Sequence, residues 1–342
     1  MKKYILYLLL IFCSIFVSVF LGELYLRLFH VQEGKRLASY DKDLGWRGKP
    51  NGKGAFVVKK AHINAKFKYN NLGFRDENVY EKKKDSFRIV LLGDSFVESL
   101  ETEYEKTFHK ILEKIVVDSL GGNYEIVIVG SHGYSTAQEL SAFKKFKEII
   151  KPDIVLLLFF TGNDFKDNMR VQFSCIDNDG KLKFNQNTNS FLKIQYLSFK
   201  RWLYENSYIT YFLKRIIVAK TGVTIADNAK NIIGNVSDEY CYNITKLLIL
   251  ETRNEIIRNN SIFGVVVIPT KEEIENKNIG GNNNVNLDFI VNLLNDNKIK
   301  FLDLSQVLQK KDYLALDLHF SDSGHKIVAE EIYKFILNTR QM

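Results

Sequence analysis

Short apolar runs alternate with amphipathic segments along most of this 342-residue chain, and this alternation limits its possible folds more than any other feature. The run Phe87–Leu92 is followed by helical spacing over Thr107–Leu120, and Tyr124–Val129 by helical spacing over Thr136–Lys151. The third run, Asp153–Phe160, is almost continuously apolar, as a strand covered on both faces should be. We therefore predict an α/β fold in which a parallel sheet lies between helices on both sides.

The alternation returns in the C-terminal half after an interruption. The elements expected there are helix, strand, helix, strand and helix, over Glu239–Asn259, Ile262–Ile268, Leu287–Leu294, Ile299–Leu304 and Ser323–Asn338. Between about 165 and 236 the pattern breaks, and Phe191–Lys220 is rich in aromatic and basic residues at near-helical spacing. We predict a helical insertion that packs on the sheet domain. A membrane-surface or substrate-gripping role is the alternative.

The N-terminus has the pattern of a membrane anchor. Lys2 and Lys3 precede an uncharged apolar stretch of about 19 residues, Tyr4–Gly22, which Glu23 ends, and this length just suffices to cross a bilayer core. The stretch lacks a well-spaced pair of small residues for signal peptidase, which favours an uncleaved signal anchor over a removed signal peptide. The two lysines predict a cytoplasmic N-terminus and an extracytoplasmic body, periplasmic or at the cell surface. The predicted domains are the anchor at 1–23, a lead-in segment packed on the core at 24–85, and the α/β domain with its insertion at 86–342.

Charge and cysteine patterns argue against several function classes. The net charge of +8 comes from lysines spread along the chain without a nucleic-acid-binding motif, so we predict no nucleic-acid partner. The three cysteines form no Cys/His cluster at metal-ligand spacing, so we predict no metal site and no cofactor. Cys175 and Cys241 are interpreted as buried free thiols, with a disulfide between them as the alternative in an oxidising compartment.

Reactive side chains stand at the ends of the predicted strands. Ser95 follows the first strand, Gly133 the second and Asn163 the third, while Asp317 and His319 precede the last helix. The carboxyl ends of parallel strands meet at one edge of a sheet, so we expect these residues to meet there. A serine hydroxyl attacks a carbonyl when an imidazole takes its proton, and a carboxylate fixes the tautomer of that imidazole. The set predicts a catalytic triad of Ser95, His319 and Asp317.

The same edge offers donors for the negative charge that forms on an attacked carbonyl oxygen. Such an oxyanion needs preorganised hydrogen-bond donors. The candidates are the backbone N–H groups of Ser95 and Gly133 and the side-chain amide of Asn163. His132 has no assigned role. His325 is a competing histidine, but its place at the start of the last helix favours a structural role in the first turn.

Four sequence blocks together resemble those of the SGNH hydrolases, also called GDSL esterases/lipases. The blocks are Gly93-Asp94-Ser95-Phe96, Gly130-Ser131-His132-Gly133-Tyr134, Gly162-Asn163-Asp164 and Asp317-Leu318-His319. The segments at 44–47, 72–76, 133–136 and 268–271 resemble those of bacterial, N-terminally anchored members. The resemblance implies a three-layer α/β/α flavodoxin-like fold, a Ser–His–Asp triad, no metal, and ester or acetyl-ester substrates.

Three positions depart from the pattern of that family. Phe96 stands where leucine is usual, and Ile128 replaces an asparagine that commonly supports the second block. Asp317 lies two residues before His319 instead of three, a spacing similar to that in SGNH-like polysaccharide acetyltransferases. All three members of the triad are present despite these departures.

These residues and the anchor predict an extracytoplasmic serine esterase that removes a small acyl group such as acetyl from an ester-bearing small molecule or a cell-envelope glycan. An O-acyltransferase would use the same triad but pass the acyl group to a sugar hydroxyl instead of water. A non-catalytic scaffold protein of an envelope-polysaccharide system is an alternative from another class. Because Ser95, Asn163 and His319 are all present, the sequence favours catalysis.

Overall fold

The computed structural model describes residues 2–29, 33–35, 37–185, 191–221, 238–278 and 284–340. The chain forms two compact units: unit 1 is Met1–Lys35 with Asn189–Gly234, and unit 2 is Arg36–Thr188 with Asn235–Met342. Residues 222–237, at the end of the predicted insertion, lie outside the described residues.

Unit 2 is built on a five-stranded sheet. Its strands, in spatial order, are β11 (Phe301–Asp303), β10 (Ile262–Ile268), β7 (Ile154–Phe160), β5 (Ser86–Gly93) and β6 (Asn123–Gly130), all paired in parallel. Read from β6 and numbered along the chain, they lie in the order 2-1-3-4-5, which is the doubly wound flavodoxin-like order. The predicted α/β fold with a parallel sheet is confirmed.

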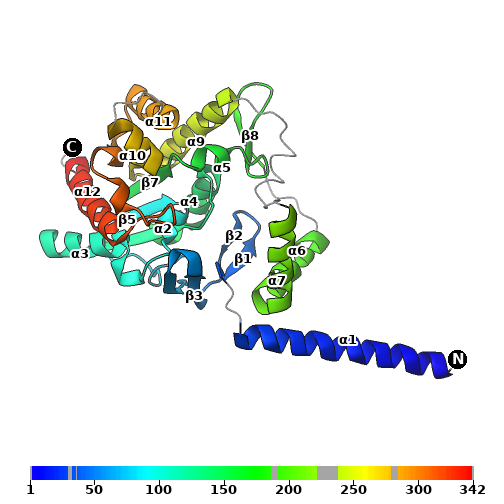
Figure 1. The fold of residues 1–342 in the computed structure, drawn as a ribbon. Coiled ribbons are helices and arrows are strands. Elements are labelled where there is room, and N and C mark those ends of the chain that lie inside the picture. Colours follow the sequence, from blue (N-terminus) through cyan, green and yellow to red (C-terminus); the bar gives the residue numbers. More distant parts are fainter. Residues whose placement is uncertain are drawn as a thin grey trace. The chain divides into compact units, whose positions relative to one another are not determined.

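Helices cover both faces of this sheet (Figure 1). α3 (Phe108–Leu120) and α12 (Asp322–Arg340) lie side by side, and α4 (Thr136–Ile150) packs against α9 (Asp238–Arg258). Parallel strands are joined by right-handed crossovers, and the strand order reverses direction after β6. The crossover through α3 therefore lies on one face, and those through α4, α9 and α11 (Val285–Asp296) lie on the other. The result is the predicted three-layer arrangement.

The apolar runs become central strands because this position removes both of their faces from water. Every residue of β7 is buried, and Ile89–Leu92 of β5 are fully buried. Each large aliphatic side chain buried in this way contributes about 1.5–3 kcal/mol. No periodicity predicts α10 (Lys271–Asn278), because Ile274 is its one apolar side chain.

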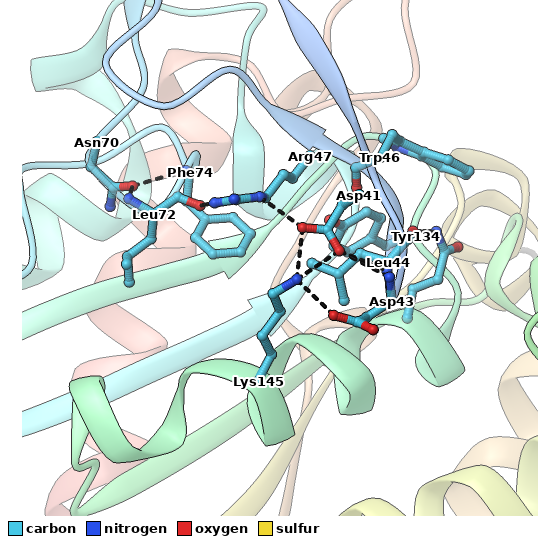
Figure 2. Close-up of polar contacts among 11 residues, drawn as sticks. Asp41, Asp43, Leu44, Trp46, Arg47, Asn70, Leu72, Phe74, Tyr134 and Lys145 are labelled. Atoms are coloured by element: carbon cyan, nitrogen blue, oxygen red, sulfur yellow. Dashed lines mark hydrogen bonds and ion pairs between the residues drawn. The ribbon is translucent and has the colours of Figure 1, made fainter. Parts of the chain in front are cut away.

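The lead-in segment is more regular than its sequence indicates. It forms two antiparallel hairpins, β1 (Ala38–Asp41) with β2 (Gly45–Gly48) and β3 (Lys53–Val58) with β4 (Ile63–Lys68). Figure 2 shows Asp41 accepting hydrogen bonds from Nζ of Lys145 at 2.8 Å and from Nε of Arg47 at 3.0 Å. Nε2 of Gln138 donates to the carbonyl of Leu44 at 2.7 Å. Since Lys145 and Gln138 belong to α4, the first hairpin is fastened to that helix.

The three cysteines are free thiols. Sγ of Cys241 donates to the carbonyl oxygen of Phe165 at 3.1 Å, and Cys175 lies beside the side chain of Asn185. Cys175 and Cys241 are both partly exposed. The expectation of free thiols is confirmed, and the expectation of full burial is wrong.

Unit 1 joins the N-terminal helix to the insertion. Its helices are α1 (Lys2–Phe29), α6 (Phe191–Asn206) and α7 (Tyr208–Thr221), which confirms the helical prediction for Phe191–Lys220. α1 continues past Glu23, whose carboxylate accepts the backbone N–H groups of Tyr208 and Ile209, each at 3.0 Å. N–H groups at a helix N-terminus have no partner within the helix, so Glu23 caps α7 and fixes it to α1.

Among the helices in the described parts of the chain, α1 is the one long and apolar enough to cross a membrane. Its candidate span, Lys3–Phe29, has a mean hydropathy of 2.7. The packing of α6 and α7 on the sheet domain stays a prediction.

Candidate active site

Ser95 lies at the carboxyl edge of the sheet, directly after β5, the first strand of the sheet along the chain. β5 ends at Gly93, and the short helix α2 (Ser95–Glu98) begins at Ser95. A Cβ atom at Gly93 would lie 2.4 Å from Cγ2 of Val97, so this tight passage from strand to helix requires glycine. Asp94 caps α2, because its Oδ1 accepts the N–H of Phe96 at 2.9 Å. Ser95 is 8% exposed.

Ser95, His319 and Asp317 form one hydrogen-bonded chain. Nε2 of His319 lies 2.8 Å from Oγ of Ser95, and Nδ1 of His319 lies 2.5 Å from Oδ1 of Asp317. The same carboxylate oxygen accepts the backbone N–H of His319 at 3.0 Å. The spacing of two residues thus lets one carboxylate hold both the ring and the backbone of the histidine. The structure brings together the three residues that the sequence suggested as a triad.

The loop that bears Asp317 and His319 is held from outside. Nζ of Lys271 donates to the carbonyl oxygens of Leu314 and Asp317 at 2.5 and 2.6 Å. At the base of the loop, the N–H of Leu314 donates to the carbonyl oxygen of His319 at 2.8 Å. The ring of Phe96, which replaces the usual leucine, lies with its centroid 4.9 Å from that of the imidazole. These contacts restrict the rotation of the imidazole.

Charges around the triad favour a protonated imidazole. Burial lowers the pKa of His319, but the carboxylates of Glu101 and Asp317 outweigh this effect and raise that pKa to about 9. Burial also raises the pKa of Asp317, but hydrogen bonds from His319 outweigh it and bring that pKa below its ordinary value. Asp317 is therefore ionised and stabilises the imidazolium that forms when a general base takes a proton.

The pH dependence of turnover follows from these charges. Because only a neutral His319 can accept the proton of Ser95, we expect kcat/KM for a neutral ester to rise with pH, with a midpoint near 9. Glu101→Gln removes one of the carboxylates and should move the midpoint to lower pH. Glu103→Gln, which removes an exposed acid, should leave the midpoint in place. The measurement is a pH–rate profile with p-nitrophenyl acetate, and equal midpoints in the three proteins would contradict the assignment.

Gly133 lies in a turn after β6. The N–H of Tyr134 donates to the carbonyl oxygen of Ser131 at 2.9 Å and closes the turn, and Gly133 has a φ of +71°. Nη1 of Arg170 donates to the carbonyl oxygen of Gly133 at 2.5 Å. Within the described part of the chain, the N–H of Gly133 forms no hydrogen bond. It is therefore available to an oxygen atom of a substrate.

Asn163 follows β7 and contacts the residue before the serine. Its Nδ2 donates to Oδ2 of Asp94 and to Oδ2 of Asp167, at 3.1 Å in both cases. The same oxygen of Asp94 lies 3.4 Å from Oγ of Ser95. The amide is thus at the site, but both of its N–H groups face carboxylates. An oxyanion role for Asn163 requires one of these N–H groups to leave its carboxylate.

The other two histidines singled out in the sequence lie apart from the triad chain. His325 is fully buried in the first turn of α12, where its Nδ1 accepts the N–H of Phe108 at 3.2 Å. The ring of His132 has its centroid 6.4 Å from that of His319. At Ile128, the backbone N–H donates to Oδ2 of Asp76 at 2.9 Å, so the lead-in segment supports this strand.

Sequence reasoning assigns no role to four residues that hold the backbone of the site: Trp46, Glu98, Arg170 and Lys271. Nε1 of Trp46 donates to the carbonyl oxygen of His132 at 3.2 Å, and Oε2 of Glu98 accepts the N–H of His132 at 2.7 Å. Trp46 and Lys271 lie in segments that resemble the flanks of the family blocks, which is a usable signal. Glu98 and Arg170 lie in no such segment, so no signal in the sequence points to them.

No protein-family model matches the sequence, and no curated protein matches it. Several solved structures are similar. An esterase of Pseudoalteromonas sp. is 9% identical, with 75% of this chain and 99% of that chain covered and a TM-score of 0.43. An acetyl xylan esterase is 13% identical, with coverage of 72% and 98% and a TM-score of 0.40. A lipase/acylhydrolase from Enterococcus faecalis is 14% identical, with coverage of 74% and 96% and a TM-score of 0.41. Because these TM-scores are below 0.5, the case for a reaction rests on the geometry of the site itself.

Proposed function

We propose that this protein is a serine esterase of the SGNH type. The observation that carries the proposal is the chain of hydrogen bonds from Oγ of Ser95 through the imidazole of His319 to the carboxylate of Asp317. A serine joined in this way to an imidazole and a carboxylate is the arrangement that activates a hydroxyl for acyl transfer. These three side chains lie at the carboxyl edge of a doubly wound sheet, where ligands bind in such folds.

In the proposed reaction, Nε2 of His319 takes the proton of Ser95 as Oγ attacks the ester carbonyl carbon. The carbonyl oxygen becomes an oxyanion and accepts hydrogen bonds from the N–H groups of Ser95 and Gly133. The amide of Asn163 becomes a third donor when one of its N–H groups leaves the carboxylate of Asp94 or Asp167. The imidazolium then protonates the departing alcohol, and an acyl-enzyme remains on Ser95. A water molecule, deprotonated by His319, then attacks the acyl carbon, the bond from that carbon to Oγ of Ser95 breaks, and the imidazolium returns its proton to Oγ as the acid is released.

We propose acetyl or another small acyl group as the acyl part, and an ester-bearing small molecule or a cell-envelope glycan as its carrier. The sequence blocks of the SGNH type support the acyl class. The apolar helix α1 supports an envelope location: with Lys2 and Lys3 on the cytoplasmic side, α1 anchors the protein and the catalytic unit is extracytoplasmic.

The test is covalent labelling of the full chain in detergent with a fluorophosphonate, followed by intact-mass measurement. We expect one adduct on the wild type and none on Ser95→Ala, because a phosphonate forms a stable bond only with an activated serine. A folded wild-type protein that takes no adduct would disprove the proposed function. An adduct that persists in Ser95→Ala would place the nucleophile elsewhere.

The second candidate is an O-acyltransferase with the same triad. The two-residue spacing between Asp317 and His319, similar to that in polysaccharide acetyltransferases of this type, is the observation that favours it. The two reactions differ in whether water or a sugar hydroxyl attacks the acyl-enzyme. Mass spectrometry of products formed with an acetyl donor and a glycan acceptor distinguishes them, since a transferase gives acetylated glycan and an esterase gives free acetate.

A further inference from the structure

The turn that contains Gly133 could be of type I or type II, and the N–H of Gly133 points in opposite directions in the two types. It spans Ser131–Tyr134, and within it Gly133 has a φ of +71° while His132 does not have a positive φ. This combination is the mark of a type II turn, in which a positive φ falls on the third residue. In a type I turn the central peptide, here between His132 and Gly133, is rotated by about 180°. The choice of form therefore decides where the N–H of Gly133 points.

The indole of Trp46 contacts that central peptide. Its Nε1 donates to the carbonyl oxygen of His132 at 3.2 Å. In a trans peptide the C=O and the following N–H point in opposite directions, so this bond aims the N–H of Gly133 away from the indole. Rotation of the peptide would replace the carbonyl oxygen by an N–H and set two donors against each other. The indole therefore favours the type II form.

The peptides on either side of the central one are held by other groups. Oε2 of Glu98 accepts the N–H of His132 at 2.7 Å. Nη1 of Arg170 donates to the carbonyl oxygen of Gly133 at 2.5 Å. These bonds fix both ends of the turn, and the bond from Trp46 acts on the one peptide whose rotation would move the N–H of Gly133.

Trp46 is itself firmly placed. Its ring packs against those of Tyr134 and Phe173, and the hydroxyl of Tyr134 donates to the carbonyl oxygen of Trp46 at 2.6 Å. The hairpin that carries it is fastened to α4 through Asp41 and Lys145, as Figure 2 shows. The indole N–H thus has a defined position relative to the turn.

We propose that Trp46 is a positioning residue that keeps the N–H of Gly133 aimed at the oxyanion of the reaction. This inference rests on the proposed esterase function and deepens it, because it makes the lead-in hairpin a working part of the active site. Trp46 acts through Gly133 and does not touch the reacting atoms. Its loss should therefore lower kcat and leave KM almost unchanged, since an oxyanion donor acts on the transition state.

The test uses Trp46→Phe, which keeps an aromatic ring and removes the N–H. With p-nitrophenyl acetate and the full chain in detergent, we expect kcat to fall by about 10-fold to 100-fold, less than loss of a whole oxyanion donor, with KM within about twofold. Trp202→Phe is the matched control, because it makes the same change at the other tryptophan, which is exposed on α6 in unit 1, whereas the turn belongs to unit 2. It should leave kcat within about twofold. Equal kcat in the two variants would overturn the proposal.

If Trp46→Phe does not fold, a second variant tests the proposal. The chain has two tryptophans, so Trp202→Phe leaves Trp46 as the one tryptophan. When this protein is made with β-(benzothiophen-3-yl)alanine in place of tryptophan, sulfur replaces the N–H at position 46 and the size of the ring is nearly unchanged. The same fall in kcat is expected, and an unchanged kcat would overturn the proposal.

Failure of the esterase function would show first, as a wild type that neither hydrolyses esters nor reacts with the fluorophosphonate. The role of Trp46 in the turn is then read from a crystal structure of Trp46→Phe. Rotation of the peptide between His132 and Gly133 supports that role, and an unchanged turn overturns it.

Discussion

Ser95→Ala and His319→Ala are each expected to lower kcat for an ester by about 10⁶-fold, and the double variant is expected to be no slower than either. Alanine at position 95 removes the nucleophile, and alanine at position 319 removes the group that takes its proton at 2.8 Å. Each change disables the same step, so the two losses do not add. The measurement is hydrolysis of p-nitrophenyl acetate, with the full chain in detergent and the uncatalysed rate subtracted.

Ser99→Ala is the matched control for this prediction. Ser99 is a buried serine that directly follows α2, the short helix that begins at Ser95. Its hydroxyl donates to the carbonyl oxygen of Phe96, outside the triad. Its loss should change Tm and leave kcat near the wild-type value. If Ser95→Ala retained more than a tenth of wild-type turnover while Ser99→Ala behaved as described, the triad assignment would be wrong.

The parts of the site that sequence predicts best are those fixed by local pattern. An apolar run that stops at Gly93 and Asp94 predicts a strand followed by a turn, and the topology of a parallel sheet then places Ser95 and Asn163 at one edge. His319 is found the same way, as the polar residue before the last helix. The structure brings Ser95 and His319 within 2.8 Å although 224 positions separate them.

The parts that sequence does not predict are those set by contacts between distant backbone and side-chain atoms. The strands of the lead-in hairpins are short, and in β1, β2 and β3 several side chains are only partly buried, so no alternation of apolar and polar residues marks these three strands. β4 does alternate, with Ile63, Ala65 and Phe67 buried and the polar residues between them exposed, and this pattern could have predicted a strand. Asp76 bonds to the N–H of Ile128, and Trp46 bonds to the carbonyl oxygen of His132. Backbone N–H and C=O groups are the same in almost every residue, so such bonds leave no motif in a single sequence. The lead-in segment therefore contributes more to the site than its sequence suggests.

The state of Asn163 is also a matter of three-dimensional contacts. Sequence position predicts an amide at the oxyanion hole, and the structure places that amide against Asp94 and Asp167. Burial raises the pKa of Asp167 to about 6, while the charge of Arg170 lowers it. Burial also raises the pKa of Asp94 above its ordinary value. Protonation of either acid would weaken its hold on the amide, which links the donor role of Asn163 to the charge on its neighbours.

Asp317→Asn is expected to lower kcat by about 10⁴-fold, the second largest effect among these variants. The carboxylate accepts the Nδ1–H of His319 and so leaves Nε2 free to take the proton of Ser95. An asparagine amide that donates to Nδ1 would put the proton on Nε2, which is the wrong tautomer for a base. The bonds from Nζ of Lys271 to the carbonyl oxygens of Leu314 and Asp317 do not involve the carboxylate, so the fold of the loop should survive. The measurement is kcat from hydrolysis of p-nitrophenyl acetate, together with Tm.

Other acids also lie near His319, so the prediction must distinguish Asp317 from them as the carboxylate that orients the imidazole. Glu101 raises the pKa of His319 and is buried, so it is the competing candidate for the orienting carboxylate. If Asp317 orients the ring, Asp317→Asn loses about 10⁴-fold and Glu101→Gln mainly moves the pH midpoint. If Glu101 orients it, the larger loss of kcat moves to Glu101→Gln. Asp322→Asn, which removes an exposed acid paired with Lys106, should retain wild-type turnover and so exclude a general effect of lost negative charge.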